Sequence, residues 1–241
     1  MNEVTPEVET VTVVKEPRIS LTMISKYLVA SEKRKISILR GCKYPSGYIP
    51  RYYEMARSLA CDLFSTNISD QQDFYFQEFS RQARLYREEA KQFPANKDNF
   101  KNRIYSANAL DFLASMSLSL QPLLNQYVLH SHLRHRKDSI VVNSVRLGAM
   151  ADMLLYDQYG ISQVGLLKFN FSATPLKKEE AVAKLYVLNQ FFVNRGVNLD
   201  SKDCILIDVL AKRIYTLTIV GAAKASLHVA TQEIGDCWTR I

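Results

Sequence analysis

Apolar residues in the first half of the chain recur at the spacing of amphipathic helices. After an apolar opening element at residues 19–30, which fits a strand or a short helix, the pattern predicts helices over residues 49–64, 70–91 and 97–117. Ser69 precedes the second of these helices as a capping residue. The apolar faces comprise Tyr52, Met55, Leu59 and Leu63 in the first helix, Phe76, Phe79, Ala83 and Tyr86 in the second, and Phe100, Ile104, Ala107, Leu110 and Leu113 in the third.

The pattern changes after Pro122 to short apolar runs, some of which alternate with polar residues. Runs of this kind, bounded by turn residues, are typical of β-strands. We therefore expect four strands between residues 127 and 172. Turn signals separate them at Lys137–Asp138, Asn143–Ser144 and Tyr159–Gly160.

The end of the chain contains two further helices and a hairpin. A helix is predicted from Pro175 to Arg195–Gly196, two strands meet in a hairpin around Ala211–Lys212, and a last helix spans about residues 224–238. The order from residue 127 is therefore four strands, a helix, two strands and a helix. This order predicts a mixed α/β core with one crossover helix.

Together these elements predict an α/β (α+β) protein whose helical N-terminal half packs on a small mixed β-sheet with flanking helices. We expect a flexible acidic tail at residues 1–17, a mainly helical region at 18–122 and a mixed-sheet core at 123–241 that forms one compact unit with it. Residues 1–17 hold four glutamates and one lysine, a net charge of −3. Residues 18–241 thus carry +10 where the whole chain carries +7.

The composition of the 241 residues is that of a folded protein with an excess of basic side chains. Hydrophobic residues make up 47% and charged residues 23%, and the pI is near 9.2. The most apolar stretch, residues 204–223, contains Asp208, Lys212 and Arg213, so a membrane span is not expected. The N-terminus is acidic and has no apolar region, so no secretory signal peptide is expected.

The cysteines and the absence of common motifs narrow the function classes. Cys42, Cys61, Cys204 and Cys237 are scattered and form no CxxC or zinc spacing, which favours reduced thiols in a cytoplasmic protein. The sequence contains no GxGxxG, GxxxxGK[ST], GxSxG or HExxH. Dinucleotide binding, P-loop hydrolysis, α/β-hydrolase chemistry and zincin proteolysis are therefore unsupported.

One acid and one lysine stand out in the apolar segment at residues 145–172. Asp152 lies in a strand-like run, and Lys168 lies between Leu167 and Phe169 in the following strand. Side chains alternate along a strand, so Lys168 shares its face with Leu166 and Asn170. An unpaired ammonium does not suit a central strand, so we expect Lys168 and Asn170 to point away from the apolar face, toward a cleft or solvent. We expect Asp152 to face the same cleft from the adjacent strand.

The order of a helix, a strand with Asp152, a turn, a strand with Lys168 and a further helix resembles the core of the PD-(D/E)XK nuclease superfamily, particularly its RecB-like exonuclease branch. The resemblance covers about residues 105–220 and implies a restriction-endonuclease-like core. It also implies that Asp152 binds Mg²⁺ and that Lys168 orients the attacking water, since such sites polarise a phosphate with carboxylate-bound metal.

The sequence departs from this family pattern at the motif carboxylate. The residue two positions before Lys168 is Leu166, which cannot bind a cation. Glu179 or Glu180 could supply a relocated acid, and the preceding helix offers only Asp111. The departure favours a degenerate, non-cleaving core, with a relocated acidic ligand as the alternative. An edge-strand lysine and a satisfied strand-end aspartate remain the structural alternatives for the two residues.

Two basic groups are candidates for nucleic-acid contact. His130, His132, Arg134 and Arg136 share one face if residues 127–137 form a strand, giving a basic ridge for phosphates. The HxH spacing of His130 and His132 also permits metal binding, although no further ligand is evident. The second group interleaves basic residues with tyrosines suited to base stacking. It contains Lys33, Arg34, Lys35, Arg40, Lys43, Tyr44, Tyr48, Tyr52 and Tyr53.

Three functions are consistent with these features. The first is DNA or RNA binding by a basic protein with a degenerate nuclease-like core, as a component of a larger nucleic-acid-processing or defence assembly. The second is an active Mg²⁺-dependent nuclease, the only case that implies a cofactor. The third is a scaffold subunit that binds an acidic protein partner. Protein partners or self-association fit each function, and Trp238 is a candidate anchor residue.

Overall fold

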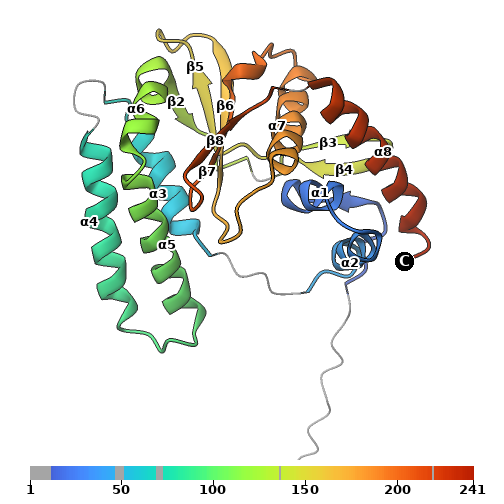
Figure 1. The fold of residues 1–241 in the computed structure, drawn as a ribbon, viewed down its shortest axis with the longest axis horizontal. Coiled ribbons are helices and arrows are strands. Elements are labelled where there is room, and N and C mark those ends of the chain that lie inside the picture. Colours follow the sequence, from blue (N-terminus) through green and yellow to red (C-terminus); the bar gives the residue numbers. More distant parts are fainter. Residues whose placement is uncertain (1–11, 47–51, 69–72, 136, 219) are drawn as a thin grey trace, which may run out of the picture.

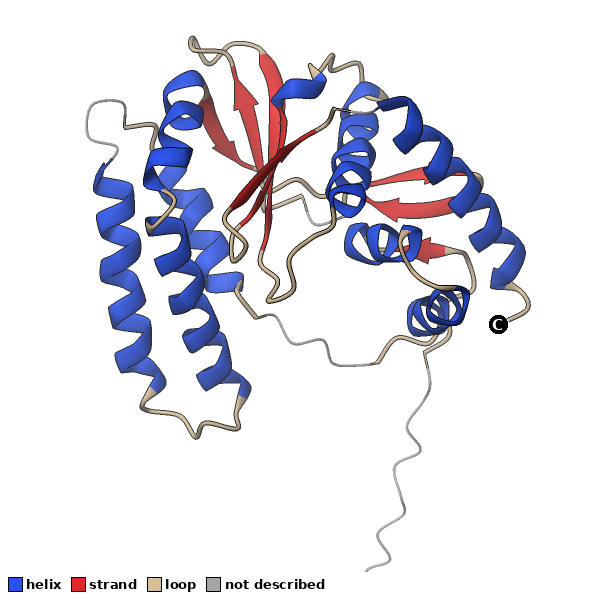
Figure 2. Cartoon of the chain, viewed as in Figure 1, coloured by secondary structure: helices blue, strands red, loops and turns tan. Residues whose placement is uncertain are grey.

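The helical spacing of the first half of the chain produces helices in the computed structural model, and mixed β-sheets with flanking helices follow (Figures 1 and 2). The structure describes residues 12–46, 52–68, 73–135, 137–218 and 220–241. The helices in this part of the chain are α1 (Leu21–Leu28), α2 (Glu32–Lys43), α3 (Glu54–Phe64), α4 (Asp73–Ala90), α5 (Asp98–Ala114), α6 (Ser117–Gln126), α7 (Lys178–Val193), the short 3-10 helix η1 (Ser201–Asp203) and α8 (Val220–Trp238).

The predicted helices are confirmed as α3, α4, α5, α7 and α8, with ends shifted by a few residues. Ser69, the expected cap of α4, lies outside the described residues. Helix α6 was not predicted because it contains Pro122, the residue at which the apolar pattern changes to that of the β-rich half. Proline removes one hydrogen bond from a helix. Leu120 and Leu123 nevertheless bury the inner face of α6.

Eight strands form two sheets in the described residues. The strands are β1 (Arg18–Ile19), β2 (Val128–Ser131), β3 (Ser139–Val142), β4 (Val145–Gly148), β5 (Met153–Tyr156), β6 (Gln163–Asn170), β7 (Cys204–Asp208) and β8 (Arg213–Thr216). The first sheet has the order β1-β4-β3 and the second the order β2-β5-β6-β7-β8. The predicted turn at Asn143 and Ser144 is confirmed as that of the β3–β4 hairpin. Five described strands lie between residue 127 and α7, where four were predicted, because the run between this turn and Tyr159–Gly160 is divided into β4 and β5, with residues 149–152 in no strand.

The five-stranded sheet is mixed, and α7 makes its crossover. Strand β5 pairs antiparallel with both β2 and β6, and β6 pairs parallel with β7. A parallel pair needs a long connection, which α7 supplies, as predicted from the sequence. Strand β8 returns antiparallel to β7 through a tight turn in which Lys212 has φ of 52°. The predicted hairpin at Ala211–Lys212 is therefore confirmed.

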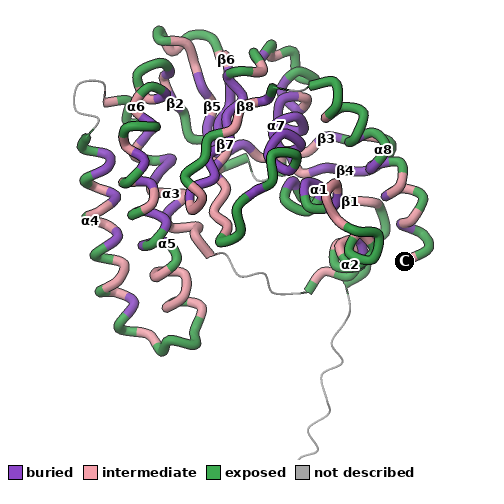
Figure 3. Tube along the Cα trace, viewed as in Figure 1, coloured by how far each residue is buried: buried purple, intermediate pink, exposed green. Residues whose placement is uncertain are grey.

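Both faces of the five-stranded sheet are covered by helices (Figures 1 and 3). Leu166 and Leu206 point to a core shared with α1, α7 and α8, whereas Leu167, Phe169 and Ile207 point to a core shared with α3 to α6. Burial on both faces explains why β6 and β7 read as nearly continuous apolar runs. The helical N-terminal half is thus divided, since α1 and α2 lie on the α7 side and α3 to α6 on the opposite side.

The two ends of the described chain pack together. Trp238 is only 2% exposed, and its indole nitrogen donates to the carbonyls of Val14 and Lys15, each at 3.2 Å. The Lys43 ammonium donates to the Trp238 and Ile241 carbonyls, both at 2.7 Å. The expectation that Trp238 anchors a partner is therefore wrong. The predicted flexible tail is also wrong for its last residues, because Val14 is buried, while residues 1–11 lie outside the described residues.

The expectations of reduced thiols and of no membrane-spanning segment can be compared with the structure. All four cysteines are free thiols, with Cys61 and Cys204 buried and Cys42 and Cys237 half-buried. In the described part of the chain, every helix is too short or too polar to cross a bilayer.

The close approach of β6 and β7 yields a stability test at Gly165. A Cβ added there would collide with the backbone carbonyl of Asp203 and lie 2.8 Å from its Cβ, whereas a Cβ at Gly41 in α2 meets nothing within 4 Å. We expect Gly165→Ala to lower the free energy of unfolding by roughly 1–3 kcal/mol through overpacking. Gly41→Ala should raise it by up to about 1 kcal/mol through helix propensity. Urea unfolding of both variants measures the two effects, and equal effects would contradict the described strand packing.

Candidate functional site

Asp152 and Lys168 meet across the β5–β6 pair. Asp152 directly precedes β5, and Met153 pairs with Leu167 in the antiparallel register, which places Asp152 beside Lys168. The Lys168 ammonium donates to Asp152 Oδ1 at 2.9 Å. The structure therefore brings together the two residues that the alternation pattern placed on one side of adjacent strands, and Lys168 is not an edge-strand lysine because β7 pairs with β6.

The Asp152 carboxylate is fully buried and takes its hydrogen bonds from the chain itself. Its Oδ2 accepts from the backbone N–H of Phe169 at 2.8 Å, and the Nε of Arg57 from α3 lies 3.7 Å from Oδ1. Arg57 Nε is the buried side-chain nitrogen that lacks a hydrogen bond among the described residues. Both carboxylate oxygens thus accept from β6, and a cation of α3 lies beside them.

The expectation that Lys168 points toward a cleft or solvent is wrong, because only 12% of its side chain is exposed and its face of β6 is covered by α7. Burial lowers the pKa of Lys168, while Asp152 opposes the shift and the like charge of Arg57 adds to it. The charged form is the one that suffers from desolvation, so Lys168 depends on Asp152 to remain protonated. The pair is therefore coupled, and neither charge is well accommodated without the other.

A second polar group lies beside this pair, on the same face of the sheet. The parallel register sets Asn170 of β6 beside Asp208 of β7, and the Asn170 amide nitrogen donates to Asp208 Oδ1 at 2.8 Å. Asp208 Oδ2 accepts from the backbone N–H of Leu176 at 2.8 Å. The Lys184 ammonium of α7 donates to Asn170 Oδ1 at 2.9 Å. A polar layer therefore separates the sheet from α7 at this end of the strands.

Asp208 and Lys184 were not predicted as site residues, although both carry a recognisable signal in the sequence. Asp208 ends the apolar run Cys204–Asp208, as an acid beside a buried strand, just as Asp152 does at the start of β5. Lys184 is 3% exposed within a helix whose neighbouring residues are almost all apolar. A charged residue inside an apolar run indicates a buried partner. The partners could not be assigned because they lie on elements far apart in sequence.

The relocated acids that the sequence offered do not reach the Asp152–Lys168 pair as ligands. Glu180 accepts from the backbone N–H of Lys177 at 2.9 Å and closes the first turn of α7, and Glu179 is exposed. Asp111 pairs with Arg87 at 2.6 Å. Leu166 is completely buried in the core on the α7 side. The residues present therefore fit Mg²⁺ poorly, since Asp152 supplies the only carboxylate of the pair and each of its oxygens already accepts a hydrogen bond from β6.

Aromatic residues gather next to Arg57. The Arg57 guanidinium lies 5.4 Å from the centroid of the Phe171 ring. Tyr53 also stacks on Phe171, with 5.9 Å between the ring centroids and 13° between the ring planes. Tyr105, which is 39% exposed, contacts both Tyr53 and Tyr52. The structure therefore brings two of the four predicted stacking tyrosines to the Arg57 side of the site. Tyr44 contacts the C-terminal carbonyl, and Tyr48 lies outside the described residues.

The first basic group lies on α2 and divides into structural and exposed residues. Lys35 pairs with Glu32 at 2.9 Å and Glu233 at 3.1 Å, and Lys43 binds the C-terminal carbonyls. These two candidates for nucleic-acid contact are engaged within the fold. The remaining three are exposed on the outer face of α2, where their charges are available to an external partner. They are Lys33, Arg34 and Arg40.

The predicted basic ridge of His130, His132, Arg134 and Arg136 is wrong. Strand β2 ends at Ser131, and a turn follows in which the backbone N–H of His135 bonds to the His132 carbonyl at 3.1 Å. His130 stays on the strand, in edge contact with Tyr156. His132 is buried, and desolvation lowers its pKa despite a hydrogen bond to a carboxylate. Arg134 is exposed in the turn, and Arg136 lies outside the described residues.

Comparison of the chain with protein-family models, curated proteins and solved structures found no match. The assignment of a function therefore depends on the chemistry of the residues described above.

The Asp152–Lys168 pair can be tested by a double-mutant cycle. We expect Asp152→Asn and Lys168→Met each to cost about 3–5 kcal/mol in unfolding free energy, because each leaves a buried charge without its partner. The double variant should cost clearly less than the sum. The exposed pair Glu88–Lys91 is the matched control, and its cycle with Glu88→Gln and Lys91→Met should give about 0–1 kcal/mol. Additive effects of Asp152→Asn and Lys168→Met would refute the coupling.

The pKa of Lys184 generates a pH test. Burial lowers this pKa from 10.5 to about 8, while Glu180 opposes the shift. Between these two pH values the unfolded chain binds a proton that the folded chain has released, so the Lys184 contribution to stability becomes more favourable as pH rises. Lys184→Met should remove this contribution, whereas Lys178→Met, at an exposed position of the same helix, should not. Urea unfolding at about pH 8 and about pH 10 measures the difference, and identical pH dependence in wild type and Lys184→Met would disprove it.

Proposed function

We propose that the protein binds nucleic acid through its basic surface and carries a PD-(D/E)XK-like core that does not cleave. In this proposal it acts as a component of a larger nucleic-acid-processing or defence assembly. The observation that carries the proposal is the buried Asp152–Lys168 pair. It occupies the positions that the resemblance gives to a metal-binding acid and a water-orienting lysine, yet its charges are neutralised within the chain.

The order of the strands supports the nuclease-like part of the proposal. Strands β2, β5 and β6 form an antiparallel series, α7 crosses over, and β7 pairs parallel with β6. The lysine lies on β6, in the strand after the aspartate as the resemblance implies, whereas the aspartate directly precedes β5 and does not lie within it. The β3–β4 hairpin lies between β2 and β5 in the sequence and joins the other sheet, so it adds to this core without interrupting it.

The contacts of Asp152 support the non-cleaving part. A metal at this carboxylate would have to replace Lys168, which lies at 2.9 Å, and the Phe169 amide, which lies at 2.8 Å. Leu166 provides no second ligand. Mg²⁺ requires several oxygen ligands in octahedral geometry, which this arrangement does not supply. The runner-up function, an active Mg²⁺-dependent nuclease, shares the Asp152–Lys168 juxtaposition but lacks a second acidic ligand at this pair among the described residues.

The distribution of charge and aromatic side chains supports nucleic acid as the partner. The chain carries a net charge of +7, and Lys33, Arg34 and Arg40 are exposed together on α2. Exposed aromatic rings near a guanidinium suit stacking on bases. Tyr105 is such an exposed ring, and the half-buried Tyr53 links it to Phe171, over which Arg57 lies. An acidic protein partner would contact the same basic side chains of α2, so an experiment must separate the scaffold function from nucleic-acid binding.

Binding of equal lengths of DNA and RNA at increasing salt tests the proposal. We expect affinity to fall steeply with salt, because each phosphate contact releases counterions. The triple variant Lys33→Gln, Arg34→Gln and Arg40→Gln should bind more weakly. Its slope of log affinity against log salt should decrease by about one for each phosphate-binding cation that is removed. Fluorescence anisotropy with labelled oligonucleotides measures both quantities.

The matched control removes three other exposed or half-exposed cations from the α4–α5 hairpin, with Arg84→Gln, Lys97→Gln and Lys101→Gln. It has the same change in net charge and should bind like wild type. Absence of binding to either nucleic acid would refute the proposal and favour the scaffold function. Cleavage in Mg²⁺ that is lost in both Asp152→Ala and Lys168→Ala would instead establish the nuclease.

A further inference from the structure

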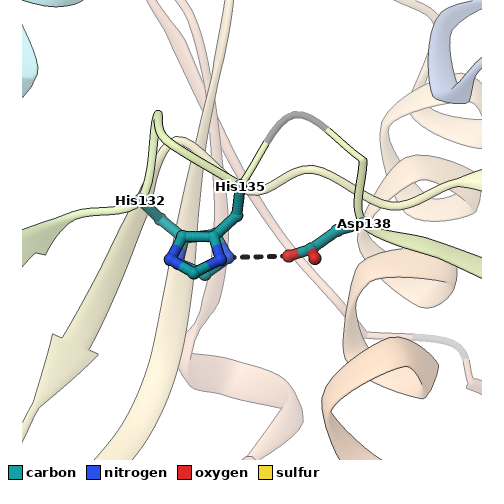
Figure 4. Close-up of side chains that lie close together, drawn as sticks. All are labelled: His132, His135 and Asp138. Carbon is teal, nitrogen blue, oxygen red and sulfur yellow. Dashed lines mark hydrogen bonds and ion pairs between the residues drawn. The ribbon is translucent and has the colours of Figure 1, made fainter.

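Three metal-ligating side chains converge in the connection between β2 and β3. His132, His135 and Asp138 each offer one donor atom, and these atoms lie within 4.8 Å of one another. The His132 Nε2 lies 2.8 Å from Asp138 Oδ2, and the two imidazole rings are stacked at 4.1 Å with 5° between their planes. Figure 4 shows both rings presenting nitrogen toward the Asp138 carboxylate. The side chains of this cluster are distinct from the polar side chains at Asp152, Lys168 and Asp208, although the His132 backbone N–H bonds to the Asp152 carbonyl at 2.8 Å.

The backbone holds this arrangement through two consecutive turns. The N–H of His135 bonds to the His132 carbonyl at 3.1 Å, and the N–H of Asp138 bonds to the His135 carbonyl at 3.2 Å. A repeat of three residues in successive turns brings residues i, i+3 and i+6 to one side of the chain. The connection is fixed at its ends, since His132 N–H bonds to the Asp152 carbonyl and Ala149 N–H to the Asp138 carbonyl, both at 2.8 Å.

The hydrogen bond between His132 and Asp138 does not by itself account for His135. Side-chain exposure is 9% for His132 and 10% for Asp138, whereas His135 is an exposed residue whose ring stacks on that of His132. The exposed imidazole of His135 therefore adds a third possible metal ligand, on the solvent side of His132 and Asp138. The cluster therefore has an inner part made by the fold and an outer ligand that solvent can reach.

The two oxygens of Asp138 have separate roles. Oδ2 points to His132, while Oδ1 lies 3.6 Å from Arg195 Nη1. Arg195 lies over the Phe191 ring at 3.8 Å and so keeps its position without binding Asp138 closely. A metal-ligating carboxylate is commonly oriented by a donor to its other oxygen. Arg195 is therefore compatible with monodentate ligation through Oδ2, although its charge lowers the attraction for a cation.

We propose that His132, His135 and Asp138 bind a divalent transition-metal ion of the zinc class. Two imidazole nitrogens and one carboxylate oxygen are a ligand set for Zn²⁺ that leaves one coordination position to solvent or substrate. Mg²⁺ and Ca²⁺ prefer oxygen ligands throughout and are excluded by the two imidazoles. Metal–ligand distances of about 2.0–2.2 Å bring donors closer than in the unliganded cluster, which requires movements on the order of 1 Å.

The bound ion would join the two sheets. The site lies in the connection from β2 of the five-stranded sheet to β3 of the three-stranded sheet, and its ends are hydrogen-bonded next to β5 and β4. Ligation adds folding stability because the unfolded chain has no preformed site. The site would also place a metal with one solvent position on the protein surface, independently of nucleic-acid binding through α2.

Calorimetric titration of the chelator-treated full chain with ZnCl₂ tests the proposal. We expect one ion per chain in wild type. The variant His135→Ala, at an exposed position that leaves the fold intact, should bind on the order of 100-fold more weakly or worse, since even an outer-shell partner costs 10- to 100-fold. Asp138→Asn should weaken binding as well. Zinc should also raise the thermal unfolding midpoint of wild type and not that of His135→Ala.

Two matched controls make the outcome decisive. His130→Ala removes an imidazole that is outside the cluster, and Cys42→Ser with Cys237→Ser removes the half-buried thiols that could take up zinc. Both controls should bind zinc like wild type. Absence of binding in wild type would overturn the proposal, as would equal binding by wild type and His135→Ala. Loss in either control would show that the zinc binds elsewhere, which also overturns it.

Discussion

The buried carboxylate of Asp152 is the constraint on which the arrangement of this molecule depends. It is fully buried, and the Lys168 ammonium and the Phe169 amide both donate to it, while Arg57 from α3 approaches it. The Asp152 backbone carbonyl accepts from His132. Three other segments, β6, α3 and the end of β2, therefore depend on one residue. Because a buried charge without partners costs several kcal/mol, any displacement of these segments is strongly opposed.

The same constraint fixes the registration of the sheet against α7. Lys168 and Asn170 lie on one face of β6, and the parallel register with β7 places Asp208 beside Asn170, where Lys184 of α7 also reaches. A shift of one residue in either strand would turn these side chains toward the apolar core formed with α3 to α6. The polar layer thus selects one register among several that apolar packing alone would allow, which is the best-attested use of buried polar groups.

Local patterns in the sequence were sufficient to predict most helices and strands and to place Asp152 and Lys168 together. Helical spacing located α3, α4 and α5, and strand alternation placed Asp152 and Lys168 on one side because their strands are neighbours in sequence. Contacts between distant segments were not predictable in this way. The pairing of β1 with β4 and the contact of Asp208 with Asn170 both join residues far apart. The end of β2 at Ser131 was missed because residues 132–135 continue the alternation of a strand in the sequence but form a turn, in which the His135 N–H bonds to the His132 carbonyl.

Two clusters contain residue types that can bind a metal, one at Asp152 and one at His132, His135 and Asp138. They differ in the number of positive charges beside them, and this difference predicts different chemistry. Asp152 is surrounded by Lys168 and Arg57, so a metal ion there would meet two positive charges at close range and would have to displace one of them. His132 and His135 present imidazoles to one carboxylate, and among the described residues one exposed arginine, Arg195, lies 3.6 Å from Asp138 Oδ1. A divalent ion is therefore favoured at the histidines and opposed at Asp152, whose role is to hold the sheet together.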